Sequence, residues 1–208
     1  MPRAPLPTFS SRSFLRTAAA ALLSLPLALP LHAAAPPPDE APEIHIQRAT
    51  GPIAIDGDLS DAGWQGATKV ETFFETNPGD NVPPKVKSVG YLTYDDRYFY
   101  AGFEFSEPDV GSLRAPYGDH DNTPSYTDYA GVILDTKHDG KSAILFLVNP
   151  VNVQYDAQTN DASGEDSSLD LYWDSATRIH KDSWTLEIRI PFSSLRYTAA
   201  DPQTWGIL

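Results

Sequence analysis

The chain has 208 residues, a formal net charge of −13 and no cysteine. Its length suits one ordinary domain, and its 41% hydrophobic content is typical of a globular chain. The lack of cysteine excludes disulfides, thiolate metal sites and the acylated cysteine of a lipoprotein. Because the strong negative charge repels phosphate backbones, we predict no nucleic-acid partner.

The N-terminal segment has the layout of a secretory signal peptide. Three arginines precede an apolar run over residues 17–31, and small residues follow it. We predict a signal peptide over residues 1–33, cleaved near Ala33, and a protein exported to the periplasm or outer membrane of a Gram-negative-type cell. The alternative is an uncleaved anchor helix, but the run is short and broken by prolines.

A proline-rich linker is predicted at residues 34–43, and one ordered domain is predicted over residues 44–208. Beyond the linker, apolar and polar residues alternate with the period of two that is typical of β-strands. Two tryptophans are predicted core residues. Trp64 follows a turn, and Trp184 alternates with apolar residues of its own strand.

The strand pattern predicts three β-hairpins, at residues 86–94 with 98–105, 129–135 with 142–149, and 169–179 with 184–190. Further strands are predicted at residues 44–46, 52–55 and 151–155, and helical turns at 60–64 and 193–195. Because residues 143–148 are apolar on both faces, we expect a central strand there.

Short strands separated by turns, without a sustained helical period, predict an all-β fold. We expect an antiparallel β-sandwich of jelly-roll or immunoglobulin-like type, with one or two short helical turns. The chain ends in an apolar run at residues 205–208. This run is typical of the inside of a strand, so we expect a longer protein.

Four motifs, in their order along the chain, resemble those of the family 9 carbohydrate-binding modules. The motifs are IDGDLSDAGW at 55–64, VGYLTYDDRYFYAG at 89–102, DYAGVILD at 128–135 and WTLEIRIPF at 184–192. The resemblance covers nearly the whole chain after the signal segment. It implies a β-sandwich that binds an oligosaccharide or a polysaccharide.

A narrower similarity is to the branch of this family that precedes an outer-membrane β-barrel domain of unknown function. It rests on NPVNVQYD at 149–156, on the strand around Trp173 and on WGI at 205–207. Asn152 stands where the branch usually has glycine, and asparagine tolerates the left-handed backbone of such a turn. The similarity implies a covalently linked C-terminal domain, with no direct membrane insertion by the domain at residues 44–208.

Sugar-binding modules stack aromatic faces on sugar rings and bind the hydroxyl groups with polar side chains. The resemblance places Asp170 and Trp173 near the family's sugar site. An alternative for Trp173 is a core position, because it shares a strand face with Leu171. We also predict carbohydrate contacts for Gln154 and Tyr155, which lie close together on one predicted strand.

A long irregular loop over residues 107–127 carries three more candidate carbohydrate ligands, Arg114, Tyr117 and Tyr126. Long loops on sandwiches often carry binding residues, although a solvated loop without a ligand is the equal alternative.

Two groups of aspartates have the spacing of calcium ligands. Asp119, Asp121 and Asp128 form the group for which we predict a structural calcium ion, while no other cofactor is expected. The other group, Asp56, Asp58 and Asp61, is interpreted as turn chemistry, in which the carboxylates bind their own backbone.

No catalytic motif is present: the sequence has no nucleophile elbow, zinc signature or phosphate loop. We therefore predict a non-catalytic carbohydrate-binding module of an exported protein, linked to carbohydrate catabolism. Two alternatives remain open. One is a structural or plug-like periplasmic domain of an outer-membrane transport barrel, and the other is an accessory domain of a glycoside hydrolase.

Overall fold

The computed structural model describes residues 42–76, 79–122 and 124–208. The predicted signal peptide and most of the predicted linker lie outside these residues. Within them, no helix is both long enough and apolar enough to cross a membrane.

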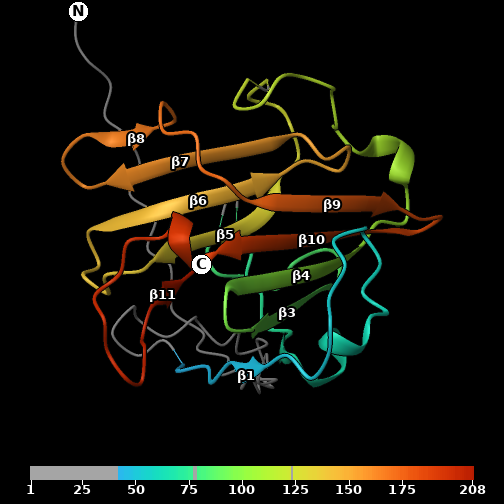
Figure 1. Cartoon of the computed structure of the whole chain (residues 1–208). Helices are drawn as coiled ribbons and strands as arrows, with labels where there is room; N and C mark the ends of the chain where they lie inside the picture. Colours follow the sequence, from blue (N-terminus) through green and yellow to red (C-terminus); the bar gives the residue numbers. More distant parts are fainter. Residues whose placement is uncertain (1–41, 77–78, 123) are drawn as a thin grey trace, which may run out of the picture. The chain divides into compact units, whose positions relative to one another are not determined.

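The described residues form two β-sheets (Figure 1). The strands of the first sheet, in spatial order, are β1 (Gln47–Arg48), β3 (Ser88–Tyr94), β4 (Tyr98–Ser106), β10 (Ser183–Pro191) and β9 (Asp174–Ile179), and β2 (Thr68–Val70) also pairs with β3. The strands of the second sheet are β11 (Gly206–Ile207), β5 (Ala130–Asp135), β6 (Ser142–Val148), β7 (Gln154–Asn160) and β8 (Gly164–Asp166). Short 3-10 helices are η2 (Ala62–Gly66), η3 (Val110–Ser112) and η4 (Phe192–Ser194).

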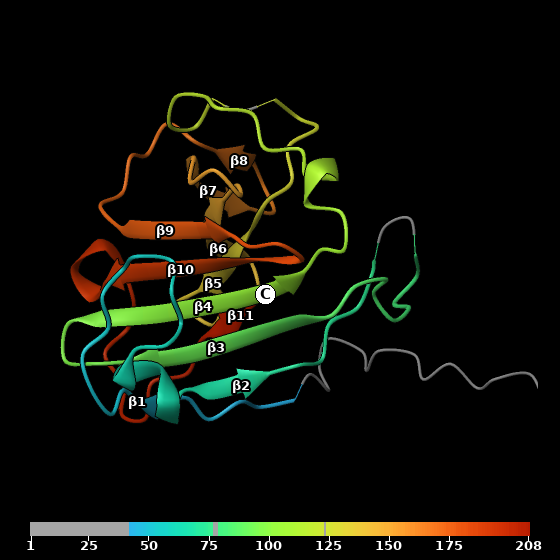
Figure 2. The same cartoon turned by 90° about the vertical axis from the view of Figure 1, so that its right-hand side faces the viewer.

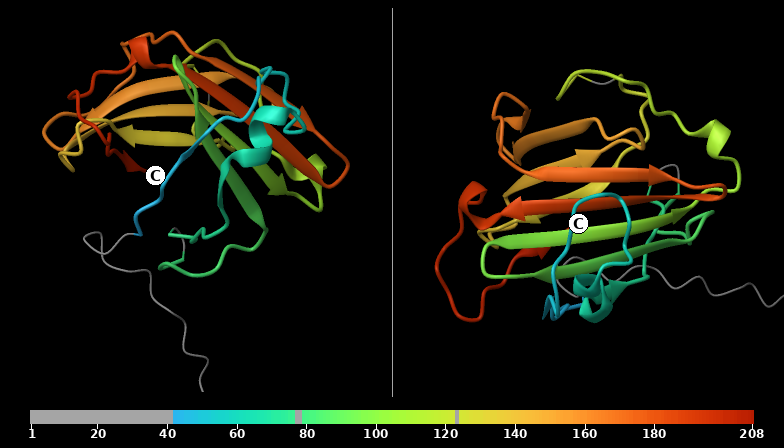
Figure 3. Two further views of the ribbon diagram at one scale, coloured as in Figure 1. Left: turned by 60° about the horizontal axis from the view of Figure 1, so that its bottom comes forward. Right: turned by 45° about the vertical axis from the view of Figure 1, so that its right-hand side comes forward.

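The main core lies between the two sheets, which Figure 2 shows one behind the other and Figure 3 shows as two layers. Alternate residues of β4 and β10 point inward, and β5 and β6 supply the opposing side chains. The fully buried members include Ala101, Leu186 and Ile188 from the first sheet and Phe146 and Val148 from the second. Each buried aliphatic side chain contributes about 1.5–3 kcal/mol, so this layer is the main source of stability.

A second, smaller core covers the outer face of the first sheet. It is built from Ile53, Trp64 and Tyr100. The first two belong to residues 52–64, the outer segment, which crosses over β4 and β10 (Figure 2). This segment is held by Glu187, whose side chain is fully buried. One carboxylate oxygen accepts the N–H groups of Asp56 and Gly57, and the other accepts the indole N–H of Trp64.

At Gly57 of this segment, the backbone conformation and the neighbouring atoms both require glycine. Gly57 has a φ of +85°, and a Cβ there would lie 2.9 Å from the carbonyl carbon of Thr177. The aspartates of the turn bind its backbone, as the sequence predicted. Asp56 Oδ1 accepts the N–H of Asp58, and Asp58 Oδ1 accepts the N–H of Ser60. The turn therefore fits closely against β9 while the carboxylates satisfy its backbone.

The main predictions of the fold are confirmed. The three predicted hairpins are β3–β4, β5–β6 and β9–β10, and β6 is the central strand of the second sheet. Trp64 and Trp184 are both buried. Asn152 adopts the left-handed conformation, with a φ of 62°. The short C-terminal strand is present as β11 and pairs with β5.

Several boundaries differ from the prediction. Residues 44–46 form no strand, and the first strand is β1, which pairs with β3 in parallel. Residues 52–55 are part of the outer segment and not of a sheet, because their apolar side chains pack against the second core. β7 begins at Gln154 and β9 at Asp174, so the polar stretch before Asp174 is a connection. The short strands β2 and β8 were not predicted.

Candidate functional site

A cleft of about 490 Å³ opens beside the start of β9, and its volume is in the range typical of small-ligand sites. Five parts of the chain meet there: the outer segment that covers the first sheet, the connection between β4 and β5, the turn before β7, the start of β9 and the end of β10. The lining residues are Ile55, Gly118, His120, Asn152, Val153, Gln154, Trp173, Asp174, Ser175 and Arg189.

An arginine–aspartate pair forms one wall of the cleft. Arg189 and Asp174 are directly opposite each other on β10 and β9. Arg189 donates from Nε and Nη2 to one oxygen of Asp174, Oδ2, at 3.0 and 2.8 Å. Among the described residues, Asp174 Oδ1 and Arg189 Nη1 have no hydrogen-bond partner, which leaves one acceptor and one donor available to a ligand.

The surroundings hold this arginine charged and in place. Its guanidinium lies over the ring of Tyr98, 5.0 Å from the centroid. Burial lowers the pKa of Arg189, but the hydrogen bonds and the charge of Asp174 outweigh that effect and raise the pKa above its usual value. Each side chain of the pair keeps about 30% exposure, so both can reach a ligand.

Two amides and a hydroxyl form another wall. Ser175 Oγ donates to Asn152 Oδ1 at 2.8 Å and accepts from Gln154 Nε2 at 3.0 Å. Asn152 Nδ2 also donates to the Ser175 carbonyl oxygen. The left-handed backbone of Asn152 brings its amide to β9. These contacts fix the orientation of both amides before any ligand arrives.

Trp173 lines the cleft but belongs to the main core. Its side chain is 5% exposed and packs edge to face on Phe146, with the ring centroids 5.3 Å apart. Its indole N–H donates to Asp156 Oδ1 at 2.9 Å. Trp173 therefore occupies a core position, which was the alternative that its spacing from Leu171 indicated. Little of its ring face is free to stack on a sugar.

Asp170 lies next to the cleft, in a side-chain group with His120 and Asp156. His120 lines the cleft and faces both carboxylates. The structure thus brings Asp170 and Trp173, the pair that the resemblance placed together, into one region with Gln154. Whether these residues contact a sugar stays a prediction.

The other candidate carbohydrate ligands lie elsewhere. Tyr155 follows Gln154 directly and points to the opposite face of β7, where its hydroxyl donates to Glu165. Arg114 lines a second cleft of about 500 Å³ and pairs with Asp128. Two exposed tyrosines, Tyr117 and Tyr126, lie on the connection between β4 and β5 and line neither cleft.

The predicted calcium ligands do not converge on one point. The Asp128 carboxylate accepts three hydrogen bonds from Arg114, which occupy both of its oxygens. Asp121 Oδ1 accepts the N–H of Asp156, and Asp119 pairs through its backbone with Asn122. In this arrangement the three aspartates do not surround one point, and a structural calcium ion stays a prediction.

Asp174, Ser175, Arg189, Asn152 and His120 were not among the predicted site residues. Arg189 carried a usable signal, because it alternates outward on a strand whose other face is apolar. Its partner Asp174 depends on the register of β9 against β10, which the sequence does not specify.

Comparison with solved structures supports the fold. A family 9 carbohydrate-binding module from Caldicellulosiruptor kristjanssonii, solved with cellotriose, is 20% identical to this chain with a TM-score of 0.50, and the match covers 78% of this chain and 73% of that one. The same module solved with glucose gives the same identity and TM-score, with 74% of that chain covered. A protein from Bacteroides uniformis described as carbohydrate-binding is 11% identical, with a TM-score of 0.53 and 72% of each chain covered.

No protein-family model matches the chain, and no curated protein matches it. The likeness is thus one of three-dimensional structure, at low sequence identity. The order of motifs along the sequence and the two-sheet arrangement agree with it. The chain therefore has the fold of the family 9 carbohydrate-binding modules.

Proposed function

We propose that this chain is a non-catalytic carbohydrate-binding domain and that its ligand binds in the cleft beside β9. The observation that carries the proposal is the pairing of a free acceptor, Asp174 Oδ1, with a free donor, Arg189 Nη1, inside a cleft of this fold. Neighbouring hydroxyl groups of a sugar ring are both donors and acceptors. Sugar hydroxyls can therefore donate to Asp174 Oδ1 and accept from Arg189 Nη1.

The remaining walls suit a neutral sugar. Gln154 and Asn152 offer fixed amide groups, and Ile55 and the edge of Trp173 offer apolar surface. A cleft of about 490 Å³ holds a short oligosaccharide end rather than a long chain. The net charge of −13 disfavours acidic polysaccharides. We infer a neutral oligosaccharide as the ligand class.

Export, a link to carbohydrate catabolism and a covalently attached C-terminal domain belong to the same proposal. The support for export is the basic, apolar and small-residue order of the first 33 residues, which lie outside the described ones. Binding without catalysis agrees with the lack of any catalytic motif in the sequence.

The proposal is tested by calorimetric titration of the chain with glucose, cellotriose and a panel of other neutral oligosaccharides. We expect saturable binding of at least one sugar and a change in tryptophan fluorescence, because Trp173 lines the cleft. Absence of heat and of any spectral change at millimolar concentration of every sugar would refute carbohydrate binding.

The location of the site is tested by Arg189→Met, with Arg178→Met as the matched control. Both arginines lie in the first sheet and both pair with an aspartate, but Arg178 pairs with Asp58 away from the cleft. Losing a charged hydrogen bond costs about 1.5–3 kcal/mol, which is about a 10- to 150-fold loss of affinity. Equal affinities of the two variants would place the ligand elsewhere.

A further inference from the structure

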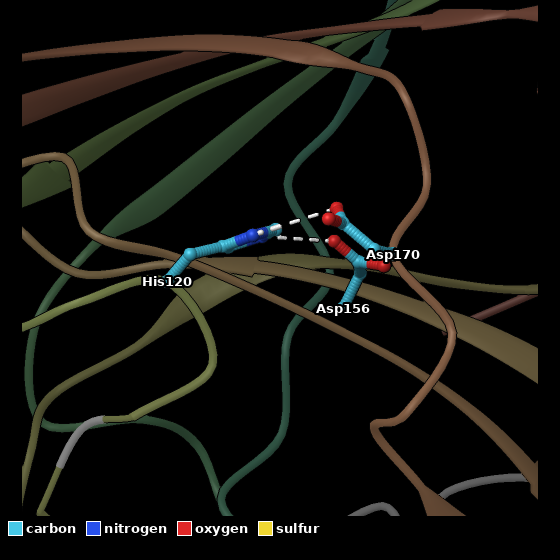
Figure 4. A group of neighbouring side chains, drawn as sticks. All are labelled: His120, Asp156 and Asp170. Atoms are coloured by element: carbon cyan, nitrogen blue, oxygen red, sulfur yellow. Dashed lines mark ion pairs between the residues drawn. The ribbon is translucent and has the colours of Figure 1, made fainter.

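A histidine and two aspartates from three separate parts of the chain point toward one another (Figure 4). His120 comes from the connection between β4 and β5, Asp156 from β7, and Asp170 from the connection that leads to β9. One possible ligand atom of each side chain lies within 4.8 Å of those of the other two. Among the described residues, this is the only group of three histidine or acidic side chains that lie this close together.

The geometry points to a divalent transition-metal site formed by His120, Asp156 and Asp170. His120 Nε2 lies 3.0 Å from Asp156 Oδ1, and Nδ1 lies 3.7 Å from Asp170 Oδ1. Two ligands bound to one ion at about 2.1 Å are separated by roughly 3.0–3.4 Å, so the first pair already has the spacing of coordinating atoms. Asp170, on an exposed connection, can move to supply the third ligand.

The charges around this histidine favour a cation. A third carboxylate, Asp121, lies 3.6 Å from His120 Nε2. In the described part of the chain, neither Lys nor Arg pairs with Asp121, Asp156 or Asp170. Three carboxylates therefore share one imidazole, and Asp156 is fully buried. A buried carboxylate whose one ion-pair partner is a histidine shared with two other carboxylates is costly, and a bound divalent ion compensates for that charge.

The buried carboxylate is also held in a fixed orientation. Asp156 Oδ2 accepts the N–H of Leu171 at 3.0 Å, and Oδ1 accepts the indole N–H of Trp173. Outer hydrogen bonds of this kind orient metal ligands in proteins. Each oxygen retains a lone pair, so the carboxylate can still bind an ion.

The donor set selects the metal class. Calcium and magnesium take oxygen ligands, whereas imidazole with carboxylates suits zinc and its transition-metal neighbours. A zinc ion bound here would link the β4–β5 connection, through His120, and the connection that leads to β9, through Asp170, to β7. It would lie at the edge of the cleft, because His120 also lines the cleft. The metal site itself does not rest on sugar binding.

The test is calorimetric titration of the untagged chain, freed of metal with a chelator, with Zn²⁺, and with Ca²⁺ as the comparison ion. The variants are His120→Ala and Asp170→Asn. Both side chains are at least a third exposed, so the fold should survive, and thermal unfolding without metal checks this. The matched control is His45→Ala, whose imidazole also lies beside a carboxylate, that of Glu43.

We expect one Zn²⁺ per chain, with little binding of Ca²⁺ at that site. His120→Ala and Asp170→Asn should weaken zinc binding by more than the roughly 10- to 100-fold typical of losing an outer partner. His45→Ala should bind like the wild type. Lack of stoichiometric zinc binding, unchanged affinity in His120→Ala, or a preference for Ca²⁺ would each overturn the proposal. In those outcomes the histidine acts only as an ion-pair partner.

Discussion

Glu187→Gln tests the buried carboxylate that anchors the outer segment to the first sheet. The wild-type side chain accepts the N–H groups of Asp56 and Gly57 on one oxygen, at 2.8 and 2.7 Å, and the indole N–H of Trp64 on the other, at 2.8 Å. Glutamine keeps the size of the side chain but has only one acceptor oxygen, because its other terminal group is a donor.

The magnitude follows from the number of donors left without an acceptor. If the amide oxygen keeps the two backbone donors, the amide NH₂ faces the indole N–H of Trp64. A buried donor without an acceptor costs about 1–3 kcal/mol, so Glu187→Gln should lower the free energy of unfolding by that amount. The matched control is Glu104→Gln on the adjacent β4, where the side chain is exposed and the expected change is within about 0.5 kcal/mol.

The pH dependence gives a second, independent measurement. Burial raises the pKa of Glu187 above its ordinary value of 4.5, and the hydrogen bonds it accepts only partly oppose this. Between the ordinary pKa of 4.5, which holds in the unfolded state, and the higher pKa of the folded state, the folded state therefore binds more protons than the unfolded state. Stability falls as the pH rises through that interval. Glu187→Gln lacks this component, so the advantage of the wild type over the variant should become smaller as the pH rises from 4.5.

Urea unfolding followed by tryptophan fluorescence, repeated across pH for the wild type and both variants, measures these free energies. Shifts in the other carboxylates cancel in the difference between wild type and variant. The reasoning fails if Glu187→Gln is as stable as Glu104→Gln, or if the difference between wild type and Glu187→Gln does not change with pH.

Two further predictions concern the turns. Gly57→Ala should destabilise the chain more than Gly140→Ala does: both positions have positive φ, which costs about 1–2 kcal/mol for alanine, but only at Gly57 does the new Cβ meet a carbonyl, that of Thr177. Equal midpoints in urea would contradict this. Burial raises the pKa of Asp95, but hydrogen bonds from two amides of its own turn and from the Tyr100 hydroxyl outweigh it and lower the pKa below 3.8. The contribution of Asp95 to stability is thus present above pH 3.8 and is lost as the pH falls through the pKa of the folded state. Asp95→Asn should therefore lose less stability in acid than the wild type. Equal losses in acid would contradict the lowered pKa of Asp95.

The hairpins were predictable because their signal is local. Alternation in β4 and β10 places one apolar face toward the other sheet, and turn residues such as Asp95 mark where the chain reverses. The segment at residues 52–55 shows where this reasoning fails. Its alternating apolar residues pack outside the sheet against Trp64, so a period of two did not mean sheet pairing. Tertiary contacts, including the hydrogen bonds that Glu187 accepts and the one that Thr185 donates to Gly57, hold this segment there.

The cleft was only partly predictable. Gln154 was identified from its position on a strand, but Tyr155 was assigned to the same site although adjacent strand residues point to opposite faces. The group of His120 with Asp156 and Asp170 joins residues far apart in sequence, and no spacing rule connects them. The Arg189–Asp174 pair depends on strand register in the same way. Long-range pairing, rather than residue type, is the missing information.

Neighbouring outward positions of β10 serve different purposes, which separates the scaffold from the ligand site. Glu187 holds the outer segment, while two residues further on Arg189 lines the cleft. The motifs that resemble family 9 modules contain Trp64, Gly57 and Glu187, all of which stabilise the scaffold. Asp174 and Ser175, which complete the cleft, lie outside those motifs. The same motifs also contain the cleft residues Ile55 and Arg189. The resemblance therefore covers the scaffold but only part of the cleft, and exchanges at the start of β9 can change the cleft while the anchored scaffold is kept.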